Sequence, residues 1–275
     1  MLRSMYSGIG GLRGFQTKLD VIGNNIANVN TTGFKKSRVT FQDIFSQTMS
    51  GGSAGTTTGT NGTGGTNPKQ VGLGSTIAAI DTIHTGGNLQ TTIKPSDVGI
   101  EGNGYFVVLD ASGEKFLTRD GNFHFDNDGY LVNANGMFVL GPGSSTSEPK
   151  DKIKIDRDYK TYSIGADGKI TYTKSDGATA EAGPIGLAMV TNPEGLEKAG
   201  MNTYKIKSPA AGTPTYGAPK SGAFGILRSS MLEMSNVDLS EEFTEMIVAQ
   251  RGFQANSRII TTSDSILEEL VNLKR

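Results

Sequence analysis

Residues 2–30 read LRSMYSGIGGLRGFQTKLDVIGNNIANVN, and residues 239–271 read LSEEFTEMIVAQRGFQANSRIITTSDSILEELV. Each stretch contains a series of residues spaced alternately by three and by four. The first series is Leu2, Met5, Ile9, Leu12, Gln16, Leu19, Gly23, Ile26 and Asn30; the second is Leu239, Phe243, Met246, Gln250, Phe253, Ser257, Ile260, Asp264, Leu267 and Val271. Such spacing aligns side chains along one side of an α-helix. The sequence therefore predicts a long helix near each end.

The predicted N-terminal helix is weak by itself. Residues 2–29 would form a helix about 42 Å long, but it contains several glycines, each of which costs about 1 kcal/mol relative to alanine. They are Gly8, Gly10, Gly11, Gly14 and Gly23. Glycine also lets another backbone approach closely, so we expect this helix to become ordered when its apolar side is buried. An ordinary core helix is the alternative.

The predicted C-terminal helix, residues 239–273, is stronger, because it has no proline and Gly252 is its only glycine. A second apolar series lies on it, made of Ile259, Ile266, Leu270 and Leu273. Two apolar sides predict contacts in two directions, with the N-terminal helix and with neighbouring subunits. A two-helix coiled coil within one subunit remains the alternative.

Two groups of candidate functional residues follow from these helices. The candidate polymerisation contacts are Leu2, Met5, Ile9, Leu12, Leu19, Ile26, Phe243, Met246, Phe253, Ile260, Leu267 and Val271. The second group is a turn motif that ends the first helix, made of Asn24, Asn25, Asn28, Asn30, Gly33 and Phe34. Asn and Gly tolerate left-handed backbone, and Asn side chains bond to nearby backbone groups.

The middle of the chain predicts β-structure. Residues 50–66, SGGSAGTTTGTNGTGGT, are a low-complexity linker, and short strands are expected from about residue 71. Strong turn pairs separate the apolar stretches: Asp120-Gly121, Asp128-Gly129, Asn135-Gly136, Asp167-Gly168 and Asp176-Gly177. The fold class expected is α+β, with the terminal helices packed as a coiled-coil-like pair and a barrel-type or sandwich-type β-domain inserted between them.

Four regions are expected from this pattern. Residues 1–30 and 236–275 form a discontinuous helical polymerisation domain, and residues 31–70 connect it to the β-domain. The β-domain comprises residues 71–145 and 185–235, and residues 146–184 form a small peripheral β extension.

Composition excludes several classes of function. The net charge of −1 gives no electrostatic argument for binding to nucleic acid. The sequence contains no run of about 18 apolar residues, so no membrane insertion is expected. The chain has no cysteine. His84 and His124 are isolated, so no metal and no cofactor is expected. A calcium loop at residues 126–129 is less well supported than a hairpin turn, because the distal Glu is missing. We find no motif of an enzyme.

Long segments resemble the bacterial flagellar rod and hook protein family. Residues 7–43, SGIGGLRGFQTKLDVIGNNIANVNTTGFKKSRVTFQD, resemble its N-terminal signature, and residues 229–275, from SSMLEMSNVDLSEEF to LVNLKR, resemble its C-terminal signature. Residues 67–92, NPKQVGLGSTIAAIDTIHTGGNLQTT, resemble the family's β-domain, as do DVGIEGNGYFVV (97–108) and FLTRDGNFHFDNDGYLVN (116–133). The resemblance covers nearly the whole chain.

Within that family, SNVDLSEEFTEMIVAQR (235–251), DSILEELVNLKR (264–275) and NPKQVGLG (67–74) are most similar to the hook type. Residues 146–184 leave room for only a small outer domain, so the chain resembles a short hook subunit. The distal rod type is the alternative within the family. A secreted β-domain binding protein or enzyme is the alternative outside it.

The resemblance implies a function and partners. Family members self-assemble into a helical tube around a channel, and the hook links rod to filament and transmits torque while bending. The implied partners are further copies of the chain, the flagellar rod, hook cap and hook–filament junction proteins, and the type III export apparatus. The implied location is the hook or basal body at the cell exterior, reached without a cleaved signal peptide.

Overall fold

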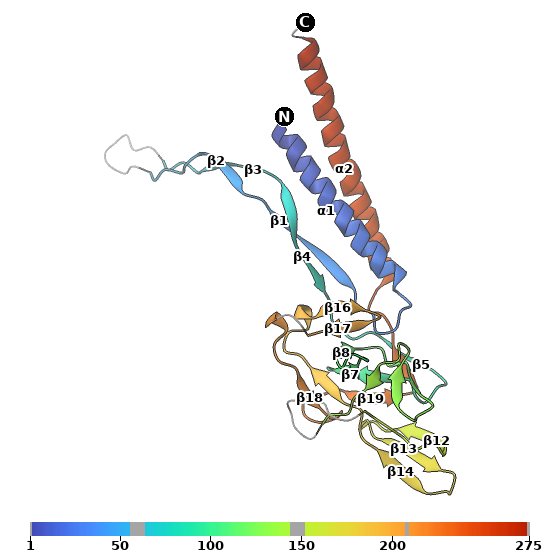
Figure 1. Cartoon of the computed structure of the whole chain (residues 1–275). Helices are drawn as coiled ribbons and strands as arrows, with labels where there is room; N and C mark the ends of the chain where they lie inside the picture. Colours follow the sequence, from blue (N-terminus) through green and yellow to red (C-terminus); the bar gives the residue numbers. More distant parts are fainter. Residues whose placement is uncertain (1, 56–63, 144–151, 207–208, 274–275) are drawn as a thin grey trace. The chain divides into compact units, whose positions relative to one another are not determined.

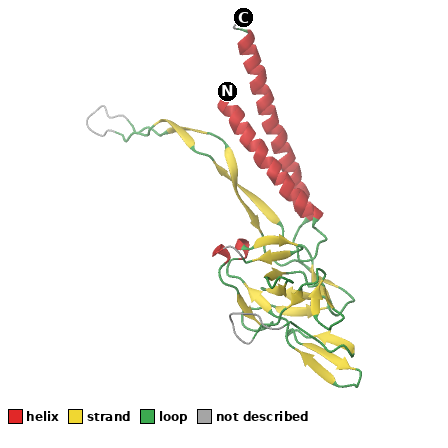
Figure 2. Cartoon of the chain, viewed as in Figure 1, coloured by secondary structure: helices red, strands yellow, loops and turns green. Residues whose placement is uncertain are grey.

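The computed structural model describes residues 2–55, 64–143, 152–206 and 209–273 (Figure 1). Along the chain, the long helix α1 (Leu2–Ala27) comes first and the long helix α2 (Leu239–Asn272) comes last. The residues between them are rich in β-strands (Figure 2). The helix bounds differ from the predicted 2–29 and 239–273 by at most two residues. The expected α+β class is confirmed.

The strands of the middle are short. In chain order they are β1 (Ser37–Asp43), β2 (Ser46–Ser50), β3 (Lys69–Gly72), β4 (Ser75–Thr82), β5 (Leu89–Thr91), β6 (Val98–Glu101), β7 (Tyr105–Leu109), β8 (Lys115–Thr118), β9 (Phe123–Phe125), β10 (Leu131–Asn133), β11 (Phe138–Val139), β12 (Tyr159–Ile164), β13 (Ile170–Lys174), β14 (Thr179–Ala182), β15 (Leu187–Met189), β16 (Glu197–Gly200), β17 (Thr203–Lys205), β18 (Thr215–Gly217), β19 (Ile226–Ser229) and β20 (Met231–Glu233). Two 3₁₀ turns, η1 (Pro193–Gly195) and η2 (Pro209–Ala211), lie among them.

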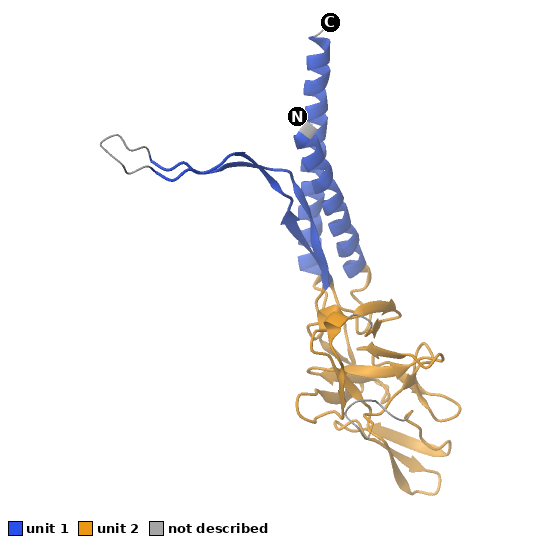
Figure 3. Ribbon diagram, turned by 60° about the vertical axis from the view of Figure 1, so that its left-hand side comes forward, with its two compact units in different colours: residues 1–26, 37–81, 239–275 blue, residues 27–36, 82–238 orange. Residues whose placement is uncertain are grey.

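The chain divides by its contacts into two compact units (Figure 3). The helical unit comprises residues 1–26, 37–81 and 239–275, and the β unit comprises residues 27–36 and 82–238. This division differs from the expected one in several places. Residues 37–70, expected as a connecting region, and residues 71–81, expected in the β-domain, belong to the helical unit. Residues 27–30 and 236–238, expected in the helical domain, belong to the β unit.

Paired strands make up the rest of the helical unit. β1 pairs with β4, and β2 pairs antiparallel with β3, with Gln47 opposite Val71. An isolated bridge between Ser53 and Thr66 continues this ribbon. The ends of the predicted Gly/Thr linker are therefore hydrogen-bonded strand continuations, and its centre, residues 56–63, lies outside the described residues.

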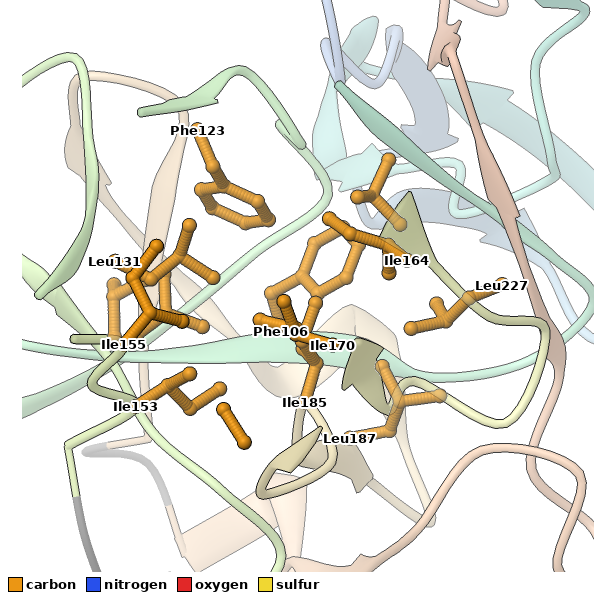
Figure 4. Packing of buried hydrophobic residues seen from close by; sticks show 14 of the residues in the cluster. Phe106, Phe123, Leu131, Ile153, Ile155, Ile164, Ile170, Ile185, Leu187 and Leu227 are labelled. Atoms are coloured by element: carbon orange, nitrogen blue, oxygen red, sulfur yellow. The ribbon is translucent and has the colours of Figure 1, made fainter. Parts of the chain in front are cut away.

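The β unit is organised around β7, which pairs with β8, β11 and β15 in a branched nine-stranded sheet. The β unit also contains a three-stranded sheet, β12–β13–β14, and two two-stranded sheets, β6–β19 and β5–β20. Phe106, Phe123 and Leu131 are fully buried at the centre of the core (Figure 4). Burying one such side chain contributes about 1.5–3 kcal/mol, so this unit is stabilised by its own interior.

Most of the predicted turn pairs are turns in the structure. Gly129, Gly136, Gly168 and Gly177 have φ between +76° and +82°, the left-handed region that favours glycine. The hairpin at Gly129 joins β9 to β10, as expected in place of a calcium loop. The exception is Gly121: it does not have positive φ, and a Cβ there would lie 1.7 Å from the Val98 carbonyl oxygen. Gly121 therefore lets its backbone lie close to the backbone of Val98, and it does not form a hairpin turn.

The segment expected to be a peripheral extension contributes to the core. Within residues 146–184, the side chains of Ile153, Ile155, Ile164 and Ile170 are buried in the same cluster as Phe106. Residues 146–151 lie outside the described part of the chain.

Candidate assembly surface

The two helices pack antiparallel within the helical unit, and glycine sets their spacing. A Cβ added at Gly8 would lie 3.3 Å from Ile260 Cγ1, and one at Gly11 would lie 2.9 Å from Asn256 Nδ2. On the other helix, a Cβ at Gly252 would lie 2.5 Å from the Phe15 ring. These contacts confirm the expectation that the glycines let another helix approach closely.

Polar groups extend the same contact face. Lys18 forms an ion pair with Glu245. Near the end of α1, buried Asn25 donates to Glu242 Oε2 at 3.2 Å and to the Ser37 carbonyl at 2.9 Å, and its Oδ1 accepts from Ser37 N–H at 3.0 Å. Asn25 therefore joins both helices and the start of β1.

A second set of glycines in α1 faces the β1–β4 pair. A Cβ at Gly10 would lie 3.2 Å from the Ser75 carbonyl oxygen, and one at Gly14 would lie 2.8 Å from the Phe41 ring. Gly23 differs from the other four, because no atom lies within 4 Å of its added Cβ. Close approach thus explains four of the five glycines.

Of the predicted polymerisation residues, Ile260 lies in the contact between α1 and α2. In α1, Met5, Leu12, Leu19 and Ile26 are half-buried and Ile9 is exposed; in α2, Met246, Ile260 and Leu267 are half-buried, whereas Phe243, Phe253 and Val271 are exposed. The Leu2 side chain lies outside the described set. Among the residues whose side chains the structure describes, the rest of this group is half-buried or exposed, so these apolar side chains are only partly covered.

More apolar side chains are exposed elsewhere on the same unit. On α2 they include Ile247, Val248, Ile259, Ile266 and Leu270, and on the strand pairs they include Phe45 and Met49. Monomeric soluble proteins rarely expose contiguous apolar patches of large area. We therefore take the outer faces of α1 and α2 as the candidate functional surface, and we call it the assembly surface.

The predicted turn motif has two parts. Asn24 and Asn25 lie in the last turn of α1, whereas Asn28, Asn30, Gly33 and Phe34 follow it. Asn28 Oδ1 accepts from the Thr31 hydroxyl at 3.1 Å. Gly33 has a φ of +68° and donates to the Glu233 carbonyl at 2.8 Å. The second part of the motif, from Asn28 to Phe34, thus belongs to the β unit, and Gly33 is required by its backbone conformation.

Three sequence profiles match the chain. "Flagella basal body rod protein" matches residues 5–35, "Flagellar hook protein FlgE/F/G D1 domain" matches residues 99–172, and "Flagellar basal body rod FlgEFG protein C-terminal" matches residues 228–273. The flagellar basal-body rod protein FlgG of Bacillus subtilis (strain 168) is 54% identical over 275 residues, which is 100% of both chains. The chain belongs to the bacterial flagellar rod and hook protein family.

Hook proteins of this family are more distant from the chain. The flagellar hook protein FlgE of Borreliella burgdorferi is 31% identical over an alignment of 447 residues that covers 100% of both chains. The crystal structure of the Helicobacter pylori hook protein FlgE2 matches 61% of this chain and 47% of that chain, with 18% identity and a TM-score of 0.24. The rod protein FlgG of Bacillus subtilis matches this chain in length and at higher identity than the hook protein FlgE of Borreliella burgdorferi. These two relatives therefore support the rod type, the alternative drawn from the sequence, better than the hook type.

Neither a metal site nor a membrane-spanning helix is found among the residues that the structure describes. No group of three or more His, Asp or Glu side chains there is placed to hold a metal ion. Neither α1 nor α2, over the residues described, is long and apolar enough to cross a membrane. His84 lies against the Tyr105 and Tyr204 rings, and its Nδ1 is 2.8 Å from the Tyr105 hydroxyl.

Sequence reasoning missed the face that pairs the helices. That face follows Gly8, Gly11, Phe15, Lys18, Ile22 and Asn25 on α1, and Glu242, Glu245, Ala249, Gly252, Asn256, Ile260 and Ser263 on α2. It has the same spacing of three and four as the apolar series. The signal that could have identified it is the placement of Gly8 and Gly11 on one side of α1.

Proposed function

We propose that this chain is a structural subunit of the flagellar rod, which polymerises with other copies into a helical tube. The observation that carries the proposal is the assembly surface: both helices expose apolar faces that only a neighbour can cover. Burying a large apolar side chain contributes about 1.5–3 kcal/mol, so repeated contacts along α1 and α2 would favour a polymer.

The resemblance to the rod and hook family implies which part of the chain forms which part of the tube. The helical polymerisation domain proposed from the sequence, residues 1–30 and 236–275, would line the channel. The β-domain proposed from the sequence, residues 71–145 and 185–235, would form the outer wall. Phe243, Phe253 and Val271 are proposed as subunit contacts because they are exposed in the single subunit. Passage through the type III export apparatus without a cleaved signal, location at the cell exterior, and contacts with hook, cap and junction proteins belong to the same proposal.

The rod type is proposed over the hook type because of the relative of matching length, FlgG of Bacillus subtilis, at 54% identity. A rod is a straight tube, whereas a hook bends. The two types therefore differ in a property that can be imaged.

Electron microscopy of the concentrated, purified chain tests the proposal. We expect straight tubes with a central channel. Tubes that curve would favour the hook subunit over the rod subunit. A monodisperse folded monomer at high concentration, with a melting temperature that rises on adding a ligand, would overturn both in favour of a secreted binding protein or enzyme.

A further inference from the structure

The chain passes between its two units four times, after residues 26, 36, 81 and 238. On the side of the β unit, three segments therefore begin or end at these crossings: residues 27–36, residues 82–88 and residues 233–238. Their hydrogen bonds decide whether the exits from the β unit are loose or fixed.

Asn236 bonds to both of the other segments. The Lys36 backbone N–H donates to Asn236 Oδ1 at 2.8 Å. Asn236 Nδ2 donates to the Ile83 carbonyl at 2.9 Å and lies 3.0 Å from Thr85 Oγ1. The triangle is closed by the Ile83 backbone N–H, which donates to the Lys36 carbonyl at 2.9 Å. Each of the three segments is thus bonded to the other two.

A buried ion cluster lies close by in the same segments. Glu233 Oε1 is 2.5 Å from Lys35 Nζ, and Glu233 Oε2 is 3.1 Å from Arg119 Nη1. The exposed fractions of these three side chains are 1%, 0% and 5%. Lys35 Nζ also donates to the Thr85 carbonyl at 2.7 Å, and Gly87 N–H donates to Glu233 Oε1 at 3.0 Å.

The placement of this cluster argues for more than general stability. Lys35 lies one residue before the second crossing, Glu233 lies five residues before the fourth, and Arg119, just after β8, connects both to the large sheet. Breaking a buried ion pair leaves an uncompensated charge in the interior, which is strongly unfavourable. The cluster therefore resists any motion that separates the entering segment from the leaving one.

We propose that Asn236 together with the Lys35–Glu233–Arg119 cluster forms a crossing clamp, which holds the segments leaving the β unit in fixed positions on that unit. As part of a rod, the clamp makes the β unit a rigid base for the chain crossings, so that torque is not lost by bending there. This mechanical part rests on the proposed function; the clamp itself does not.

Hydrogen exchange on the full-length monomer tests the clamp. In Asn236→Ala, we expect amide exchange in residues 33–37 and 82–86 to rise by about tenfold, the factor that corresponds to losing one or two net hydrogen bonds. Exchange in β7 and β8 should not change. The matched control is Asn135→Ala, which removes an exposed Asn side chain from a turn of the same unit. Unchanged exchange at the crossings, or a rise throughout the β unit, would overturn the clamp.

A second variant and a second measurement separate the two parts of the proposal. In Glu233→Gln the carboxylate charge is lost with little change in shape, and the same two segments should again exchange faster. If that variant does not fold, the Asn236→Ala result decides alone. For the mechanical part, tubes of Asn236→Ala should form but have a shorter persistence length than wild-type tubes. Equal persistence lengths would refute the torque role, whereas failure of the wild type to form tubes would refute the proposed function and leave the clamp standing.

Discussion

The two units of this chain place their apolar side chains in opposite ways. In the β unit, Phe106, Phe123 and Leu131 are completely buried, and the exposed large apolar side chains described there are Ile93 and Met201. In the helical unit, Ile22 and Ala249 are the buried apolar residues among those described. The helix α2 and the strand pairs expose many large apolar side chains, and α1 exposes Tyr6 and Ile9. The β unit is complete as a single copy. The helical unit leaves apolar side chains exposed that a second molecule would have to bury.

This difference between the units fits the proposed role of the chain as a polymer subunit. The core of the β unit specifies a single arrangement of that unit, because close-packed interiors do so. A helical unit with little interior contributes little stability until a neighbour adds buried area.

Phe253→Asp should abolish tube formation without changing the melting temperature of the β unit. Phe253 is exposed on α2, and a carboxylate placed in an apolar contact without a partner is costly to bury. Electron microscopy and thermal unfolding measure the two effects. Gln254→Asp, which places the same charge at the neighbouring exposed position, is the control and should still assemble. Normal tubes from the Phe253 variant would show that this face of α2 is not a contact.

Two substitutions of phenylalanine by alanine, one in each unit, compare the stability that each unit gains from its apolar side chains. Phe106→Ala should lower the free energy of unfolding of the β unit by about 3–5 kcal/mol, because it leaves a cavity in a packed core. Phe243→Ala should lower that of the monomer by less than about 0.5 kcal/mol, because its ring is half exposed at the surface. Denaturant unfolding of dilute monomer gives both values. Equal losses would mean that the helical unit has an interior of its own.

Gly33→Val should destabilise the β unit by about 3 kcal/mol. Valine at a φ of +68° is strained, and a Cβ there would lie 2.6 Å from the Asp120 backbone nitrogen. Gly113→Val is the matched control, since Gly113 has a φ of +81° but no atom within 4 Å of its added Cβ. The control should lose only about 1–2 kcal/mol. Equal melting temperatures for the two variants would show that the Asp120 contact is irrelevant.

The sequence predicted the helices well and their pairing poorly, for one physical reason. A spacing of three and four identifies a helix, and the bounds of α1 and α2 agreed within two residues. Every helix, however, carries several such series at once. The predicted contacts were taken from the apolar series, whereas residues of another series, Gly8, Gly11 and Asn25, contact α2 in the structure. Periodicity cannot rank these series when small and polar side chains form the interface.

The strand pairs of the helical unit were missed for a different reason. β1 and β4 are separated by more than thirty residues, so their pairing is non-local and depends on packing against α1. The intervening Gly/Thr composition is typical of a flexible linker. The Asp-Gly and Asn-Gly turns of the β unit, in contrast, are local signals, and all but Asp120-Gly121 were read correctly.

Acid should weaken the β unit through His84. Burial, together with the positive charges of Lys35, Lys198 and Arg119, lowers the pKa of His84 from 6.5 to about 4. Above pH 6.5 the imidazole is neutral in both the folded and the unfolded chain, so stability does not change. As the pH falls from 6.5 to 4, only the unfolded chain binds the proton, and stability falls by on the order of 2 kcal/mol.

The measurement is the free energy of unfolding of the monomer between pH 7.5 and about 4. His84→Gln should remove this part of the pH dependence, and carboxylate titration at lower pH should be the same in both proteins. The exposed His124→Gln is the control and should keep the wild-type curve. A His84 variant with an unchanged curve would contradict the assignment.

The smallest effect tests whether the helices already pair in the free subunit. Gly23 is exposed with no atom within 4 Å of an added Cβ, so Gly23→Ala should stabilise α1 by about 1 kcal/mol through helix propensity alone. At Gly252 an added Cβ would lie 2.5 Å from the Phe15 ring, so in Gly252→Ala the ring must move and the gain should be cancelled. Circular dichroism of dilute monomer measures both changes in helix content. If both variants gain helix equally, α1 and α2 do not touch at Gly252 in the monomer, and the helical unit forms its contacts only after assembly. If only Gly23→Ala gains, the two helices come together before the polymer forms, and the assembly surface is presented as a preformed pair.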